Sequence, residues 1–199
     1  MASRRGGRAQ RRPKRNFVRR ILVVTEGVIT EREYVERLNV YLRSKSATAV
    51  VKSVGVGADP LRVVEKSIEL RDLAASSEKR YDVCVCLVDV DDHSTLERAS
   101  RLAESESVLL LISNLKFEVW LRWHSEDKRS ALSSSQLDRQ VAKLKLTAGK
   151  SLALQFPISQ VDEACRIARA ADTAMEAGRT GPDPSSAMPI LVDLMRGAS

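Results

Sequence analysis

The chain has 199 residues, of which 43% are hydrophobic and 4% aromatic, and its formal net charge is +7. This length favours one domain, and the hydrophobic content excludes a wholly disordered chain. No apolar run approaches the ~20 residues that a membrane span needs, and the N-terminus lacks the hydrophobic segment of a signal peptide. Three cysteines without the spacing of a disulfide framework indicate a reducing compartment, so we expect a cytoplasmic protein without a membrane partner.

The positive charge is concentrated at the N-terminus. The first twenty residues contain nine Arg or Lys and no acid, whereas the remainder has 24 basic against 26 acidic residues. We predict that residues 1–20 form a disordered basic arm, because such runs stay solvated and attract polyanions by counterion release. The arm makes nucleic acid, DNA or RNA, the expected partner; the alternative is a solubilising tail. The candidate contacts are Arg11, Arg12, Lys14, Arg15, Arg19 and Arg20.

Four short apolar segments predict β-strands. The first and third are continuously apolar runs rich in β-branched residues, which is typical of strands buried on both faces of a parallel sheet. In the third segment Cys84 and Cys86 lie two residues apart, so we expect both to be buried on the same face. The predicted strands are 21–24, 48–54, 83–88 and 108–112.

A helical pattern follows each of the first three strands. Apolar residues recur at helical spacing after Thr30, and Thr30 with Glu33 three residues later forms a candidate capping box. Asp59 followed by Pro60 predicts the N-cap and first position of a second helix. A third helix is expected over 95–103.

The alternation of strands and helices in residues 21–115 predicts an α/β fold, with a mostly parallel, Rossmann-like sheet flanked by helices. The remainder, 116–199, is predicted to be a helical C-terminal region. Its expected helices are 117–124, 134–144, 160–175 and 187–195, with a Gly/Pro/Ser loop over 178–186.

Acidic residues follow two of the predicted strands. Glu26 comes after the first strand, and Asp89, Asp91 and Asp92 come after the third. Ligand sites in open parallel sheets form at the carboxyl ends of the strands, so neighbouring strands would bring these carboxylates together. Their mutual repulsion would be relieved by Mg²⁺ or Mn²⁺. The ordinary alternative is a helix cap, which Asp92 would suit; His93 stays open as a proton shuttle, a metal ligand or a loop residue.

Several motifs occur along the chain in a recognisable order. They are Thr25-Glu26-Gly27 with Thr30-Glu31 and Tyr34, Val54-Gly-Val-Gly57, Tyr81-Asp82, Asp89-Val-Asp-Asp-His93, Ser113-Asn114, Phe117-Glu118, Trp120-Leu121, His124, and Asp183-Pro-Ser-Ser186 before Leu191-Val192. The order strand, Glu, helix, strand, helix, strand, DxD resembles the Toprim fold of topoisomerases, primases and some nucleases. More specifically, the chain resembles the RloB family from about residue 18 to the C-terminus, so that 21–199 would form one RloB-like domain with its Toprim-like core at 21–115.

The resemblance implies a role in phage defence, through restriction or abortive infection, as a Mg²⁺-dependent nuclease acting on DNA or RNA. By analogy Glu26 would be the general acid/base and Asp89 and Asp91 the metal ligands, with Asp92 as a further candidate ligand. The family commonly has a second acid where Val28 stands, and its loss favours the alternative. That alternative is a non-catalytic nucleic-acid- or partner-binding subunit of a defence system. Whichever function holds, a homodimer or a partner in a defence complex is expected.

The segment 117–124 places its aromatic residues and His124 on one helical face, which is typical of a buried core. Glu118 either pairs with Arg122 at i, i+4, or reaches the carboxylates and supports a second metal, as in some Toprim nucleases. Lys150 lies in a Gly-Lys-Ser loop that lacks the upstream glycine of a P-loop. This excludes nucleotide binding by that route and leaves Lys150 available to contact a phosphate.

Overall fold

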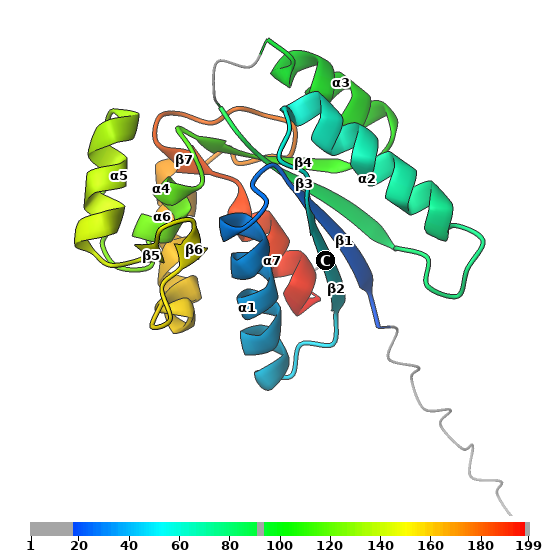
Figure 1. Cartoon of the computed structure of the whole chain (residues 1–199), viewed down its shortest axis with the longest axis horizontal. Helices are drawn as coiled ribbons and strands as arrows, with labels where there is room; N and C mark the ends of the chain where they lie inside the picture. Colours follow the sequence, from blue (N-terminus) through cyan, green and yellow to red (C-terminus); the bar gives the residue numbers. More distant parts are fainter. Residues whose placement is uncertain (1–17, 91–93, 198–199) are drawn as a thin grey trace, which may run out of the picture.

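The computed structural model describes residues 18–90 and 94–197. Its centre is a five-stranded sheet in the order β2-β1-β3-β4-β7 (Figure 1). The first four strands in this order are parallel, and β7 is antiparallel at the edge. The predicted mostly parallel sheet is therefore confirmed. The strands are β1 (Arg20–Thr25), β2 (Val50–Gly55), β3 (Val83–Asp89), β4 (Leu109–Asn114) and β7 (Ser185–Ser186), with β5 (Thr147–Ala148) and β6 (Ser151–Leu152) in a separate hairpin.

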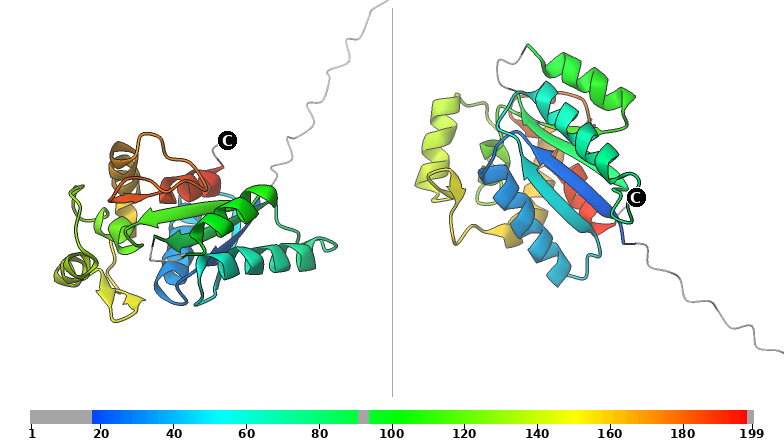
Figure 2. Two further views of the ribbon diagram at one scale, coloured as in Figure 1. Left: turned by 90° about the horizontal axis from the view of Figure 1, so that it is seen from above. Right: turned by 45° about the vertical axis from the view of Figure 1, so that its right-hand side comes forward.

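Helices cover both faces of the sheet, with α2 and α3 on one face and α1 and α7 on the other (Figures 1 and 2). Within the described residues, every helix is too short or too polar to cross a membrane. The helices are α1 (Thr30–Ser44), α2 (Pro60–Ala74), α3 (Leu96–Ser105), α4 (Glu118–Arg122), α5 (Ser134–Lys143), α6 (Val161–Ala171) and α7 (Met188–Arg196), with a 3-10 turn at Ile158–Gln160.

Each face of the sheet carries its own hydrophobic core. Side chains alternate along β1, so Ile21 and Val23 face α1 and α7 while Leu22 faces α2 and α3. All three are fully buried, as expected for an apolar strand without polar alternation. Cys84 and Cys86 are free, buried thiols in the smaller core, which confirms their predicted placement.

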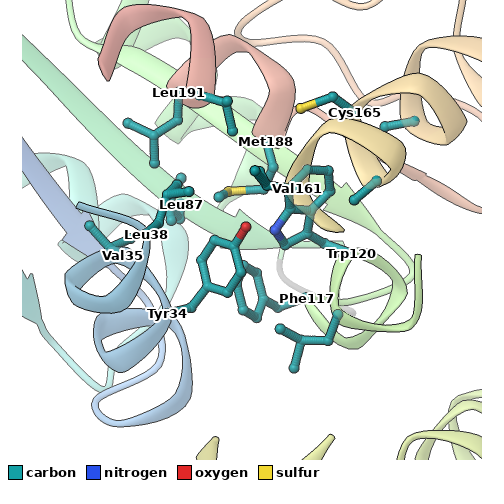
Figure 3. Close-up of a cluster of buried hydrophobic side chains, with 14 of the residues drawn as sticks. Tyr34, Val35, Leu38, Leu87, Phe117, Trp120, Val161, Cys165, Met188 and Leu191 are labelled. Atoms are coloured by element: carbon teal, nitrogen blue, oxygen red, sulfur yellow. The ribbon is translucent and has the colours of Figure 1, made fainter. Parts of the chain in front are cut away.

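The larger core is rich in aromatic side chains (Figure 3). Tyr34 of α1 packs edge-on against Phe117 and Trp120, with ring centroids 5.5 and 6.1 Å apart. Met188 and Leu191 of α7 complete this region. Full burial of one such large apolar side chain stabilises the fold by ~1.5–3 kcal/mol. The packing therefore fixes α1 and α4, together with the acidic side chains that they carry, relative to the sheet.

The start of α1 differs from the prediction. The N-cap is Ile29, without a side-chain cap, so the capping box of Thr30 and Glu33 is wrong. The Thr30 hydroxyl donates instead to the Lys150 carbonyl, and the Glu33 carboxylate accepts from the Leu152 N–H at 2.9 Å. Both side chains therefore bind backbone groups of the β5–β6 hairpin. Their hydrogen-bonding capacity is used there and not in a cap at the start of α1.

The second helix begins as predicted. Asp59 is the N-cap of α2, its carboxylate accepts from the Leu61 N–H at 3.1 Å, and Pro60 follows in the first turn. Such a cap stabilises a helix by ~1 kcal/mol. The carboxylate of Asp59 is thereby fixed at the carboxyl end of β2.

The C-terminal region is less uniformly helical than predicted. It contains the β5–β6 hairpin, and β7 lies inside the predicted loop 178–186. The predicted helix 160–175 ends at Ala171, and the predicted helix 117–124 is reduced to the five residues of α4. Strands of two residues carry too little pattern to be recognised in a sequence.

Candidate functional site

Acidic side chains gather at the carboxyl ends of β1, β2 and β3. Glu26, Glu31, Asp59 and Asp89 line one open cavity of about 440 Å³, whose other lining residues are Gly27, Gly57 and Ala58. Because β1 and β3 are directly paired, with Thr25 opposite Leu87, the structure brings Glu26 and Asp89 to the same edge of the sheet. This is the edge at which open parallel sheets bind their ligands.

The turn that carries Glu26 is fixed by both neighbouring strands. The Glu26 N–H donates to the Leu87 carbonyl at 3.0 Å, and the Glu26 carbonyl accepts from the Gly57 N–H at 2.8 Å. A side chain at Gly27 would place its Cβ 1.7 Å from a Glu31 oxygen. Instead the Gly27 N–H donates to Glu31 Oε1 at 3.2 Å. Glycine at this position is what allows the carboxylate of Glu31 to reach the turn.

Asp89 is partly buried at the end of β3. Burial raises the pKa of its carboxyl group well above the usual range, and the neighbouring Glu31 carboxylate raises it further. Glu118 and Glu26 act in the same direction, while a hydrogen bond from the Phe117 N–H opposes the shift. Four carboxyl groups, from the turn after β1 and from α1, β3 and α4, therefore interact electrostatically at one place.

Glu31 belongs to the same cluster, although sequence analysis did not include it among the site residues. Burial raises the pKa of Glu31, and the Glu118 and Glu26 carboxylates add to that rise. The Thr30-Glu31 motif was the available signal. Whether Glu31 of this motif reaches the cavity depends on the direction in which α1 leaves the sheet, because only the first turn of that helix faces the cavity. Asp59 was interpreted only as a helix cap, which it also is.

Glu118 interacts with the cluster rather than with Arg122. The buried Arg122 guanidinium donates to Gln140 Oε1 at 3.0 Å and to the Lys128 carbonyl. Within the part of the chain that the structure describes, Glu118 and Arg122 form no ion pair, so of the two alternatives the i, i+4 pair is not the one formed. Glu118 instead raises the pKa values of Glu31 and Asp89.

His124 is a core residue. Its Nε2 lies 3.1 Å from Tyr34 Oη, and its Nδ1 lies 3.1 Å from the Trp120 carbonyl oxygen. The carbonyl can only accept, so Nδ1 carries the proton and Nε2 accepts from the Tyr34 hydroxyl. Burial lowers the pKa of His124 to about 4. The buried, hydrogen-bonded histidine that the helical face predicted is confirmed.

Two groups of candidate residues are not placed at this cavity. Arg19 and Arg20 lie at the beginning of β1, at the opposite end from Glu26, where the Arg20 N–H donates to Asp82 Oδ2 at 2.8 Å. Six residues of strand span about 20 Å. Arg11, Arg12, Lys14, Arg15, Asp91, Asp92 and His93 lie outside the described residues.

The donor set fits a hard divalent cation. All the side chains are carboxylates, and among residues 18–90 and 94–197 no Lys or Arg forms an ion pair with Glu31, Asp89 or Glu118. Over the same residues, no three His, Cys, Asp or Glu side chains are arranged to hold a metal ion on their own. Mg²⁺ typically takes one or two carboxylates, with water and substrate phosphates as its remaining ligands.

Comparison with known proteins places the chain in a family. A family model described as RloB-like protein matches residues 21–195, which is most of the chain. No significant match exists among curated proteins or among solved structures.

Proposed function

The chain belongs to the RloB-like protein family, and we propose that it is a Mg²⁺- or Mn²⁺-dependent nuclease that hydrolyses phosphodiester bonds of DNA or RNA in phage defence. The observation that carries the proposal is the convergence of Glu26, Glu31 and Asp89 on one cavity at the carboxyl ends of parallel strands. Burial and mutual repulsion raise the pKa values of two of these groups, which is common at functional sites.

Glu26 and Asp89 are the first candidates to hold the cation, and Glu31 and Glu118 are the next. A bound divalent cation would polarise the phosphoryl oxygen and lower the pKa of a bound water. Asp91, which sequence analysis assigned as a ligand together with Asp89, remains a candidate on the grounds of its D-x-D spacing.

Glu26 is the candidate general acid/base. Its Oε2 accepts a hydrogen bond from the Asp89 N–H at 3.3 Å, and the side chain lines the cavity. A carboxylate oriented in this way can take a proton from an attacking water or return one to the leaving oxygen. Glu31 and Asp89 would meanwhile hold negative charge against the cation.

The basic arm would contribute affinity rather than chemistry. Its attachment to β1 is one strand length from the carboxylates. Seventeen residues can extend at most about 60 Å, so an arm of this length could follow a polynucleotide that also enters the cavity. Contacts of Arg and Lys with phosphates are independent of sequence and sensitive to salt.

One observation favours a second candidate function, a non-catalytic binding subunit of a defence system. Val28 stands where the family commonly has a second acid, and its side chain is 51% exposed beside the cavity turn. A site with one fewer carboxylate would bind a cation more weakly and could have lost catalysis.

Cleavage assays separate the two functions. Labelled single- and double-stranded DNA and RNA are incubated with the full chain in Mg²⁺, in Mn²⁺ and in EDTA. We expect cleavage only with metal, and a loss of at least 100-fold in Glu26→Gln and Asp89→Asn. Glu69→Gln, an exposed acid on α2 with Lys66 as its ion-pair partner, is the matched control. Binding that survives EDTA, without cleavage of any substrate, would support the binding subunit instead.

A further inference from the structure

The β5–β6 hairpin is held against the first half of α1 by side chains of that helix (Figure 1). The Thr30 hydroxyl donates to the Lys150 carbonyl, Glu33 accepts from the Leu152 N–H at 2.9 Å, and Arg37 Nη1 donates to the Ala153 carbonyl at 2.6 Å. These positions are i, i+3 and i+7, so they share one face of the helix. Hydrogen bonds of three side chains on one helical face therefore fix where the hairpin lies.

The side chain at the hairpin tip takes no part in this attachment. Ala148 pairs with Ser151, so Gly149 and Lys150 form a two-residue turn, and Gly149 has the φ of +64° that such turns favour. Only the backbone carbonyl of Lys150 binds α1. The exposed ammonium group of the Lys150 side chain forms no ion pair within the described residues, so this group is available for a ligand.

The tip lies beside the first turn of α1, the turn that also contributes Glu31 to the carboxylate cavity. The hydroxyl that binds the Lys150 carbonyl belongs to Thr30, and the next residue, Glu31, lines the cavity. A Cβ added to Gly149 would meet no atom within 4 Å, so the space beside the tip is open. The flexible four-carbon stem of a lysine gives the ammonium group a wide range of positions there.

A positively charged side chain near the cavity would offset the repulsion between its carboxylates and a phosphate. A phosphodiester carries a negative charge and would be repelled by Glu26, Glu31 and Asp89, and a single divalent cation offsets only part of that repulsion. We propose that Lys150 binds a backbone phosphate of the polynucleotide as it enters the carboxylate cavity. This proposal rests on the nucleic-acid function proposed above. Because lysine acts on phosphate as a point charge, the contact would be independent of base sequence.

The test compares Lys150→Ala and Lys150→Arg with Lys143→Ala in the full chain. Lys143 is an exposed lysine at the end of α5 that lines a different hollow, with Glu126, Lys128 and Gln140. Fluorescence anisotropy with a labelled single-stranded oligonucleotide gives the affinity from about 50 to about 300 mM salt, a range over which phosphate contacts weaken strongly. Thermal unfolding checks that the hairpin is intact, since its attachment uses the carbonyl and not the side chain of residue 150.

We expect Lys150→Ala to weaken binding about fivefold and to reduce the slope of log K against log[salt] by about 1, with Lys150→Arg restoring both. Lys143→Ala should behave like the wild type. An unchanged affinity and slope in Lys150→Ala would overturn the proposal, as would an equal loss in Lys143→Ala. The binding readout does not need turnover. A wild-type chain that binds through Lys150 but cleaves nothing would therefore contradict only the nuclease function.

Discussion

Glu26 Oε2 accepts a hydrogen bond from the Asp89 backbone N–H at 3.3 Å. The carboxyl ends of two paired strands are thus joined through an acidic side chain that lines the cavity. Glu31 approaches the same turn through the Gly27 N–H. The positions of these carboxylates are therefore set by the sheet and the first turn of α1. These elements hold the carboxylates close together although they repel one another.

Asp89→Asn should stabilise the metal-free protein. The pKa of Asp89 in the folded chain lies above its unfolded value, so the folded state loses stability as the pH rises through that folded pKa. Asparagine removes the charge and keeps an oxygen that can accept from the Phe117 N–H. We expect a higher free energy of unfolding than that of the wild type at about pH 8 in EDTA, and a smaller difference at about pH 5. Chemical denaturation at both pH values measures it; destabilisation at the higher pH would contradict the charge repulsion.

His124 should make stability depend on pH in the opposite sense. Its pKa is lowered from 6.5 to about 4, so its contribution is fully present above about pH 6.5 and is lost as the pH falls towards 4. The full loss is about 3 kcal/mol, at about 1.36 kcal/mol for each pKa unit. Unfolding of the wild type and His124→Gln across this pH range isolates the contribution. Parallel profiles for the two proteins would show that the histidine does not titrate as described.

Val28→Glu should strengthen metal binding. The position is half exposed next to Gly27, and a glutamate there would supply the second acid that the resemblance in the sequence implies for this position. Because affinity for hard cations rises with the number of carboxylate ligands, we expect Mn²⁺ to bind about 3–10-fold more tightly. Val40→Glu, on an exposed position of α1, adds the same charge away from the cavity and should leave the dissociation constant unchanged. Equal effects of the two substitutions would indicate a general charge effect.

Removal of residues 1–17 should weaken nucleic-acid binding and flatten its salt dependence. The segment contains seven Arg or Lys, and the slope of log K against log[salt] falls by about 0.9 for each phosphate of duplex DNA that the protein no longer neutralises. Arg20 is retained because it begins β1. Turnover at saturating substrate should change little, since the carboxylates lie at the other end of the strand. A salt slope equal to that of the full chain would exclude the arm as a phosphate-binding element.

The sequence predicted the parallel strands and the acidic residues that lie directly after them. Continuous apolar runs predicted the parallel strands, and the acids after them predicted that Glu26 and Asp89 would meet. The place of Glu31 could not be predicted in the same way, because it depends on the direction in which α1 leaves β1. The hairpin was missed because two-residue strands have no periodicity. Thr30 and Glu33 were misinterpreted as a cap because their partners are more than a hundred residues away.

The central claim is that the carboxylates at the ends of β1 and β3 bind a divalent cation. Calorimetric titration of Mn²⁺ into the wild type, the double variant Glu26→Gln/Asp89→Asn and the control Glu69→Gln tests it directly. We expect binding at millimolar or lower concentration in the wild type and the control, and none in the double variant. Equal binding by all three proteins would place the cation elsewhere and contradict the account.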